Sequence, residues 1–212
     1  MTPLSDFRNQ VAIHVIGCPD IVIYQAVLDS CIDFCQATNI VRETLDQIAV
    51  KASDFQIDLT SSNGTRIVQV QRAWIDGTEL SPIQEDATGV FGYVQDVPGQ
   101  TPPTGFPKVF SEESPGVIAL YPRPDKDYTL TVRVSTKPSR SATAVNDVLY
   151  EDWVGVVASG ALGTLMSMNQ PWEDRKRAEM EKKLFKASIG EAIIESRRGR
   201  NRAEDRVSPV WV

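Results

Sequence analysis

The chain has 212 residues, 42% of them hydrophobic and 24% charged, which is the composition of an ordinary globular protein. This length supports one good-sized domain whose core needs no disulfide or metal ion to hold it together. No apolar run approaches the roughly 20 residues of a membrane span, and the first residues lack the pattern of a secretion signal, so we expect no membrane partner.

The net charge of −6 is unevenly distributed along the chain. Residues 197–212 hold five arginines against Glu204 and Asp205, a balance of +3 that leaves −9 for the rest. A basic tail on an acidic body predicts that the tail has a partner of its own. The acidic body argues against tight binding of duplex DNA, because that affinity depends on neutralising phosphates.

Two helices are predicted in the first 40 residues. The first is short, from about residue 4 to residue 15, and Gly17-Cys18-Pro19 breaks it. The second begins at Pro19 and Asp20, since proline suits a first turn and an aspartate suits the positive end of a helix. It carries apolar residues at helical spacing and should end near Thr38-Asn39.

The three cysteines are Cys18, Cys31 and Cys35. An odd number favours reduced thiols, and the spacing of Cys31 and Cys35 places both on the buried face of the second helix as small core residues. No further cysteine and only one histidine are available to complete a zinc site, so we predict no metal and no cofactor.

The middle of the chain changes to the period of β-strands. Strands are predicted at residues 43–52, 55–59, 65–75, 78–80, 116–121 and 128–135. Asp76-Gly77 predicts a tight hairpin, because such a turn needs positive φ at its centre. Residues 99–105 are rich in proline and glycine and should hold no regular structure, which indicates a surface loop or a binding excursion.

The last third is predicted to be a helical hairpin. A first helix should run from Asp147 to about Met168, with Asn146 or Asp147 as its N-cap, and a second from Trp172 to Arg198. Gly155, Ser159 and Gly163 recur every fourth residue of the first helix. Each interior glycine costs about 1 kcal/mol of helix propensity, so we interpret this stripe as a surface on which another helix packs closely.

Nothing in the sequence predicts an enzyme. His14 is the only histidine, and there is no nucleophile elbow, phosphate-binding loop or dinucleotide fingerprint. Adjacent carboxylates such as Glu112-Glu113 and Glu151-Asp152 are typical of a solvated surface. An enzymatic function is kept as an alternative, namely a small hydrolase that uses His14 or a carboxylate pair.

The patterns together predict an α+β fold. A C-terminal helical hairpin plus an N-terminal helix would form a small bundle from residues 1–40 and 141–198. An antiparallel β-rich region, residues 41–140, would be inserted into it, with its Pro/Gly-rich loop near 98–107. Residues 199–212 would form an extended C-terminal arm.

Several short stretches follow one another in a recognisable order along most of the chain. They are Cys18-Pro19 opening a helix that ends Phe34-Cys35-Gln36-Ala37-Thr38, then Val41-Arg42-Glu43, Asp58-Leu59, Gly64-Thr65-Arg66-Ile67-Val68, Asp76-Gly77-Thr78-Glu79-Leu80, Ile118-Ala119-Leu120-Tyr121-Pro122-Arg123-Pro124, Gly160-Ala161-Leu162, Pro171-Trp172, and a helix from Ala178 to Phe185. In their order and spacing the chain resembles the head-to-tail adaptor proteins of tailed bacteriophages, similar to the podovirus tail tubular protein A group.

This resemblance implies a structural subunit of the phage neck, assembled in the host cytoplasm and located in the virion. Such adaptors form rings, usually of twelve copies, that join the portal to a downstream tail or nozzle protein, while genomic DNA only passes through the lumen. The portal-docking arm would comprise Arg200, Arg202, Arg206, Val210, Trp211 and Val212, and a tail-facing loop would comprise Pro102, Pro103 and Phe106. Two alternatives remain, another neck or tail-completion component, and a nucleic-acid-binding module that uses the arginine-rich tail.

Overall fold

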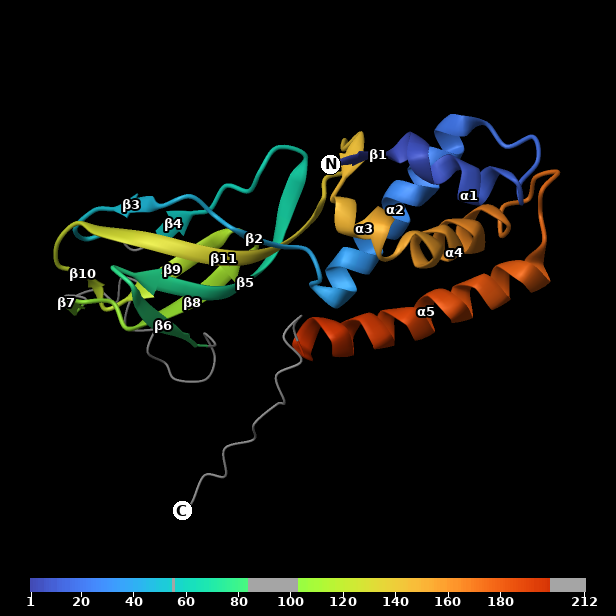
Figure 1. Cartoon of the computed structure of the whole chain (residues 1–212). Coiled ribbons are helices and arrows are strands. Elements are labelled where there is room, and N and C mark those ends of the chain that lie inside the picture. Colours follow the sequence, from blue (N-terminus) through green and yellow to red (C-terminus); the bar gives the residue numbers. More distant parts are fainter. Residues whose placement is uncertain (55, 84–102, 199–212) are drawn as a thin grey trace, which may run out of the picture. The chain divides into compact units, whose positions relative to one another are not determined.

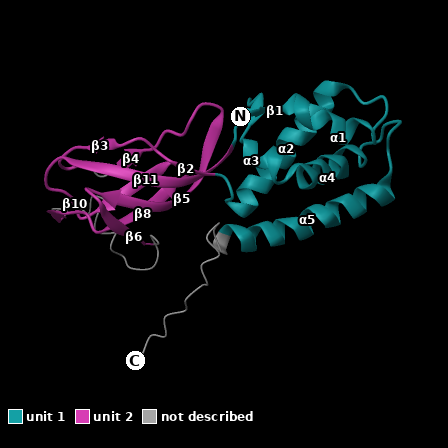
Figure 2. Cartoon of the chain, in the orientation of Figure 1, with its two compact units in different colours: residues 1–41, 138–212 teal, residues 42–137 magenta. Residues whose placement is uncertain are grey.

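The computed structural model describes residues 1–54, 56–83 and 103–198 (Figure 1). The chain divides into two compact units (Figure 2). Unit 1 is Met1–Val41 with Pro138–Val212, and unit 2 is Arg42–Lys137. Each unit buries its own hydrophobic cluster, and the two clusters share no residue.

Unit 1 is helical, with one small strand pair. In chain order its elements are β1 (Thr2–Pro3), the 3-10 helix η1 (Leu4–Phe7), α1 (Arg8–Ala12), α2 (Asp20–Thr38), β12 (Ala144–Val145), α3 (Asp147–Glu151), α4 (Val154–Leu165) and α5 (Arg175–Arg198). The strands β1 and β12 pair antiparallel, Thr2 with Val145, and so bring the start of the chain beside α3.

The prediction of the second helix is confirmed by α2. Its C-cap, Asn39, lies in the left-handed region with φ of 51°, and its backbone N–H donates to the Cys35 carbonyl at 3.0 Å. Asparagine tolerates this conformation better than most residues, so it ends the helix at small cost. The prediction that Cys31 and Cys35 are core residues is also confirmed, because both are fully buried.

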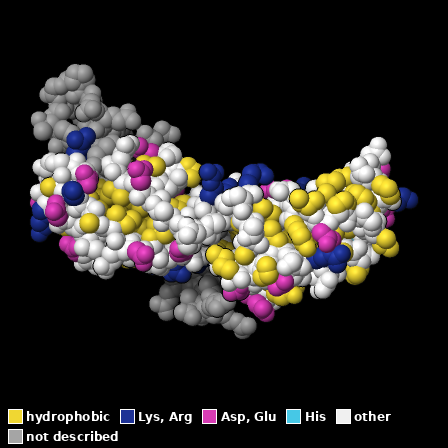
Figure 3. All heavy atoms as spheres, turned by 90° about the horizontal axis from the view of Figure 1, so that it is seen from above, with side chains coloured by type: hydrophobic (Ala, Val, Ile, Leu, Met, Phe, Trp, Pro, Cys, Tyr) yellow, Lys and Arg dark blue, Asp and Glu magenta, His cyan; other side chains and the backbone are white. Residues whose placement is uncertain are grey.

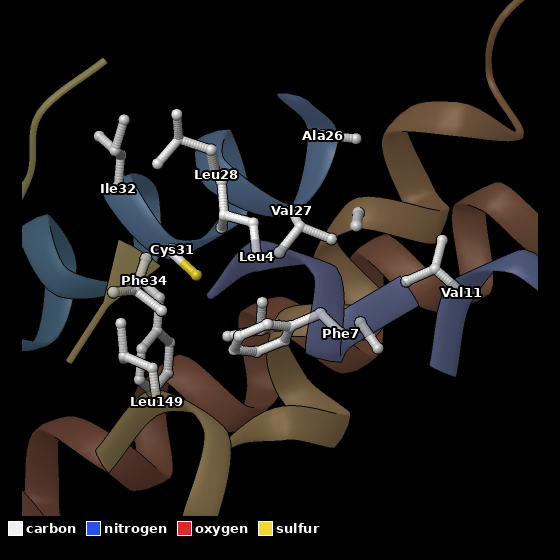
Figure 4. Packing of buried hydrophobic residues seen from close by; sticks show 14 of the residues in the cluster. Leu4, Phe7, Val11, Ala26, Val27, Leu28, Cys31, Ile32, Phe34 and Leu149 are labelled. Atoms are coloured by element: carbon white, nitrogen blue, oxygen red, sulfur yellow. The ribbon is translucent and has the colours of Figure 1, made fainter. Parts of the chain in front are cut away.

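The core of unit 1 gathers around α2 (Figure 4). Phe34 is fully buried, and its ring centroid lies 5.2 Å from that of Trp153, at the start of α4, and 6.4 Å from that of Phe185 on α5. Leu149 of α3 belongs to the same cluster and lies beside Phe34. Phe34 therefore connects three helices that follow much later in the chain.

Unit 2 is a curled sheet of eight strands with a short strand pair beside it. Its strands are β2 (Arg42–Thr44), β3 (Ile48–Val50), β4 (Gln56–Asp58), β5 (Thr65–Ile75), β6 (Thr78–Pro82), β7 (Thr104–Gly105), β8 (Val109–Ser114), β9 (Val117–Tyr121), β10 (Arg123–Pro124) and β11 (Tyr128–Pro138). The order in the large sheet is β2-β11-β5-β6-β8-β9-β4, with β3 also paired to β11 (Figure 1). The long strands β5 and β11 lie next to each other in it.

The hairpin predicted at Asp76-Gly77 is confirmed. Both residues have positive φ, 47° and 82°, and Ile75 pairs with Thr78 across the turn. The Asp76 carboxylate also accepts a hydrogen bond from the Thr129 backbone N–H at 3.1 Å. The turn residue thus fixes β11 as well as the hairpin.

The predicted fold class is wrong for the helices. The five α-helices of the described residues do not reduce to a C-terminal hairpin plus one N-terminal helix. Residues 147–168 form two helices, α3 and α4, because Trp153 leaves the helical conformation with φ of −128° while its ring packs on Phe34. The expected helix over residues 4–15 is a 3-10 turn followed by a five-residue helix.

The predicted fold class is also wrong for the sheet, which is mixed rather than antiparallel and makes the protein more β-rich than expected. β6 pairs parallel with β8, and β7 pairs parallel with β10. A parallel pair needs a long connection that returns the chain to the same direction, and 26 residues, 83–108, separate β6 from β8. The segment 99–105, predicted to hold no regular structure, contributes Thr104–Gly105 as β7.

Candidate functional site

The small-residue stripe predicted for helix packing lies on α4. Gly163 is buried against α5, where a Cβ at that position would stand 2.8 Å from Lys182 Cγ and 3.3 Å from the Lys182 backbone nitrogen. Ser159 is half-buried, whereas Gly155 is exposed and a Cβ there would meet nothing within 4 Å. The structure therefore places one of the three residues at a close helix contact and one in open space.

Among the described glycines, the tightest surroundings are at Gly160, which the four-residue spacing did not select. A Cβ on Gly160 would lie 2.0 Å from Ser30 Oγ of α2 and 3.0 Å from two ring carbons of Phe185 on α5. Gly160 is thus the point where α2, α4 and α5 meet. Gly160 and Gly163 are three residues apart, a helical spacing that could have identified this pair.

Small polar side chains stabilise the same contact. Ser167 Oγ donates to the Gly163 carbonyl at 2.6 Å, and Lys182 Nζ of α5 donates to Ser167 Oγ at 2.7 Å. Thr164 Oγ1 similarly donates to the Gly160 carbonyl at 3.2 Å. Because both hydroxyls donate to carbonyls of α4, the carbonyls near its C-terminal end gain partners without holding the helices apart.

His14 links the turn after α1 to the start of α5. Arg177 Nη2 lies 3.0 Å from His14 Nδ1, and Arg177 Nε lies 3.6 Å from a Glu181 carboxylate oxygen. In this arrangement the arginine donates and the imidazole nitrogen accepts. The histidine connects two elements of unit 1, which is a structural use of its ring.

The two buried thiols of α2 are held in their protonated form. Burial raises the pKa of Cys35 to about 12. The pKa of Cys31 is also raised, mainly by burial and to a smaller extent by the neighbouring Cys35 thiol. A thiol that does not ionise is a poor nucleophile and a poor metal ligand. In the described part of the chain, no group of three or more His, Cys, Asp or Glu side chains is placed to hold a metal ion.

The carboxylate pair Glu112-Glu113 lies on β8, at an irregularity in the pairing of this strand with β9 between Glu112 and Ser114. Glu112 accepts a hydrogen bond from the Val70 backbone N–H of β5 at 2.9 Å, and Glu113 accepts one from the Gln56 side chain. The two carboxylates therefore serve separate structural bonds. Glu151-Asp152, at the end of α3, is exposed.

The sequence matches the model of the SU10 adaptor protein family over residues 2–209. The chain belongs to the SU10 adaptor protein family. This membership confirms the resemblance to phage head-to-tail adaptors that the order of motifs indicated. A search of curated proteins found no match. An adaptor is a structural component, so the family favours a non-catalytic role for the contacts described above.

The loop predicted to face the tail lies only partly in the described region of this SU10-type adaptor. Pro102 falls outside it. Pro103 is exposed, and its carbonyl accepts a hydrogen bond from the Arg123 backbone N–H at 3.0 Å. Phe106 is half-buried, and its ring meets the edge of the Tyr128 ring at a centroid distance of 5.4 Å. Phe106 therefore anchors the end of this segment to the core of unit 2.

The proposed portal-docking arm lies outside the described residues of the adaptor. This applies to Arg200, Arg202, Arg206, Val210, Trp211 and Val212. The described part ends with α5, so the arm continues directly from a helix that packs on α2 and α4. Among the described helices, none has the length and apolar content needed to cross a membrane.

The adaptor's N-terminus is bonded to the first turn of α3. The Met1 ammonium donates to Asp147 Oδ2 at 2.9 Å, and Thr2 Oγ1 donates to Asp147 Oδ1 at 2.7 Å. The ammonium first, and then the Thr2 hydroxyl, hold the pKa of Asp147 below its ordinary value. A carboxyl with a depressed pKa in the folded state adds stability above its unfolded pKa of about 3.9, and loses it as the pH falls through the folded pKa.

Replacing Asp147 with asparagine should therefore lower the free energy of unfolding at pH 7 but not at the acidic limit. We expect the difference between Asp147→Asn and the wild type to shrink as the pH falls below about 3.9, where the carboxyl of the unfolded chain takes up a proton, and to be lost once the pH has passed the lower pKa of the folded state. Denaturant unfolding at a series of pH values measures this. Glu151→Gln, an exposed carboxylate on the same helix, is the matched control, and an Asp147→Asn effect that does not change with pH would contradict the assignment.

Proposed function

We propose that this chain is the ring-forming subunit of a phage neck, which joins the portal of the head to the tail. The observation that carries the proposal is the family match over residues 2–209, which spans both units and the C-terminal segment. The ring would hold about twelve copies, the number that the adaptor resemblance implies, and genomic DNA would pass through its lumen.

The two units would have different roles within that ring. Unit 1 packs its helices closely at Gly160 and Gly163, where an added Cβ would force neighbouring atoms to move, and such close packing suits a rigid part of a ring. Unit 2 presents Pro103, exposed beside the undescribed Pro102, as part of a platform for a downstream tail or nozzle protein. Segment 199–212, with an apolar Val210-Trp211-Val212 ending, would dock on the portal.

Deleting residues 199–212 should abolish binding to the portal protein of the same phage while leaving a folded chain. The arm supplies the aromatic anchor that typically dominates an interface, and the described core does not include it. Binding is measured by mass photometry of mixtures of adaptor and portal, folding by thermal unfolding, and the number of copies by electron microscopy of the complex. Unimpaired portal binding by the truncated chain would refute the role of the arm.

Two point variants of the full chain separate the parts of the arm. Trp211→Ala should weaken portal binding by roughly 30-fold, the equivalent of the 2 kcal/mol of an interface hot spot. Changing Arg200, Arg202 and Arg206 together to glutamine should mainly slow association and reduce its dependence on salt. If the arm instead gives salt-sensitive binding to DNA and none to the portal, the nucleic-acid-binding alternative is correct.

A further inference from the structure

The face of α5 that points away from the core of unit 1 carries large apolar side chains in solvent. Met180, Leu184 and Ile194 are 64%, 55% and 52% exposed. With Ala187, also exposed, they follow steps of four, three and seven residues, so they lie along one face of the helix. We call these four residues the α5 stripe.

The α5 stripe is not the face that holds α5 in its own unit. Ala178 and Ala192 are buried, and the half-buried Phe185 packs against the core cluster, on the opposite side of the helix. Single exposed apolar residues are common on proteins, but a row of them at the spacing of helix packing is typical of a surface that another element covers. The side of α5 opposite its packed face therefore carries apolar as well as charged residues.

A second group of exposed apolar residues occurs where α1 leads into α2. Ile13, Ile16 and Ile21 are 67%, 84% and 76% exposed, although Val15 between them is buried. We call these three residues the isoleucine patch. The face of unit 1 that carries α1 and α2 shows gathered hydrophobic side chains in the space-filling view (Figure 3).

The two surfaces belong to segments of opposite charge. Residues 175–198 of α5 hold eight basic and four acidic residues, a net charge of +4. Residues 1–41, which include the isoleucine patch, hold four aspartates and one arginine, a net charge of −3. On α5, Lys176 and Lys183 are exposed and seven residues apart, so they follow one edge of the stripe. Unlike charges favour contact between the two segments, whereas two α5 helices would repel each other.

We propose that the α5 stripe of one copy packs on the isoleucine patch of the neighbouring copy in the ring. This inference rests on the proposed function, because it names the partner within that ring. Two different surfaces on one chain make a head-to-tail contact, and repeated head-to-tail contacts close into a ring when the rotation allows it. A second copy is the occupant that supplies both the apolar surface and the opposite charge.

Substituting a charge into either surface should break the ring. Leu184→Glu and Ile16→Glu each place a carboxylate in the contact, so we expect each to weaken self-association at least tenfold, or about 1.4 kcal/mol. Lys186→Glu is the control, since it changes the charge of α5 more but lies off the stripe. Assembly is measured by mass photometry and electron microscopy, for the chain alone and with its portal. Ile16 is so exposed that its substitution leaves the fold intact, which thermal unfolding verifies.

Cross-linking then identifies which surfaces meet. In a Cys18→Ser background, where Cys31 and Cys35 are buried, a mixture of Leu184→Cys and Ile16→Cys chains should give disulfide-linked dimers, and either variant alone should not. Dimers from Leu184→Cys alone would mean a symmetric contact and overturn the inference. Rings that survive both glutamate variants would also overturn it, while leaving the proposed function intact. A wild-type chain that forms no ring even on the portal would instead overturn the proposed function.

Discussion

Replacing Gly160 with alanine should lower the free energy of unfolding by about 2 kcal/mol, although alanine favours the helical state by about 1 kcal/mol. The new Cβ would lie 2.0 Å from Ser30 Oγ and 3.0 Å from the Phe185 ring, on two different helices. Both neighbours are held by the core of unit 1. A shift of α4 away from Ser30 would therefore move the new Cβ closer to Phe185, and the reverse shift would move it closer to Ser30. Denaturant unfolding followed by circular dichroism at 222 nm measures the change.

Three further variants separate the effect of crowding at Gly160 from the effect of helix propensity. Gly155→Ala, on the same helix with nothing within 4 Å, should raise the free energy of unfolding by about 0.5–1 kcal/mol. Among the described residues, Ser30 Oγ has no hydrogen-bond partner, so Ser30→Ala alone should cost little. In a Ser30→Ala background, Gly160→Ala should then cost about 1 kcal/mol less than in the wild type. Equal effects of Gly155→Ala and Gly160→Ala would show that no close packing exists at Gly160.

The contrast between these two glycines shows what the sequence could and could not predict. The sequence did predict that this helix packs closely against another helix. Glycine is unfavourable inside a helix, so its repeated use there indicates a close contact. Which glycine faces a neighbour depends on how the helix is rotated against α2 and α5, and the residues that lie against Gly160, namely Ser30 and Phe185, are far away in the sequence. The spacing of Gly155, Ser159 and Gly163 could not contain that information.

Elements with local chemical signals were predicted well. The helix α2 and the turn at Asp76-Gly77 each rest on residues within a few positions of one another. Strand β8 was missed because four of its six residues, Val109–Ser114, are polar, and Glu112 uses its carboxylate to bond the Val70 backbone of a distant strand. The two-residue strands β1 and β12 lie more than 140 residues apart and carry no local signal.

Of the candidate interaction surfaces, too, one could be predicted from the sequence and another could not. The arginine-rich arm was visible as a change of charge along the chain. The α5 stripe was not visible, because α5 also has apolar residues that pack inward, such as Ala178, Phe185 and Ala192. Met180, Leu184 and Ile194 become informative only once the structure shows which residues are buried. Whether an apolar residue is exposed depends on the fold, so the sequence alone cannot distinguish exposed apolar residues from buried ones.

Replacing Phe34 with alanine should lower the free energy of unfolding of unit 1 by about 4 kcal/mol, the cost of a large cavity in a helical core. Phe34 is fully buried and touches the aromatic rings of Trp153 and Phe185, so no single helix can move to fill the space. Hydrogen exchange followed by mass spectrometry should show amide exchange in α2, α4 and α5 faster by roughly a thousandfold.

Leu130→Ala is the matched variant in unit 2, since Leu130 is also fully buried but belongs to the cluster of the sheet. It should cost about 3 kcal/mol and speed exchange in β5 and β11, with little change in α2. Because the two hydrophobic clusters share no residue, each substitution should act mainly on its own unit. Equal acceleration in both units after either substitution would contradict this expectation, because it would mean that the two units unfold as one body.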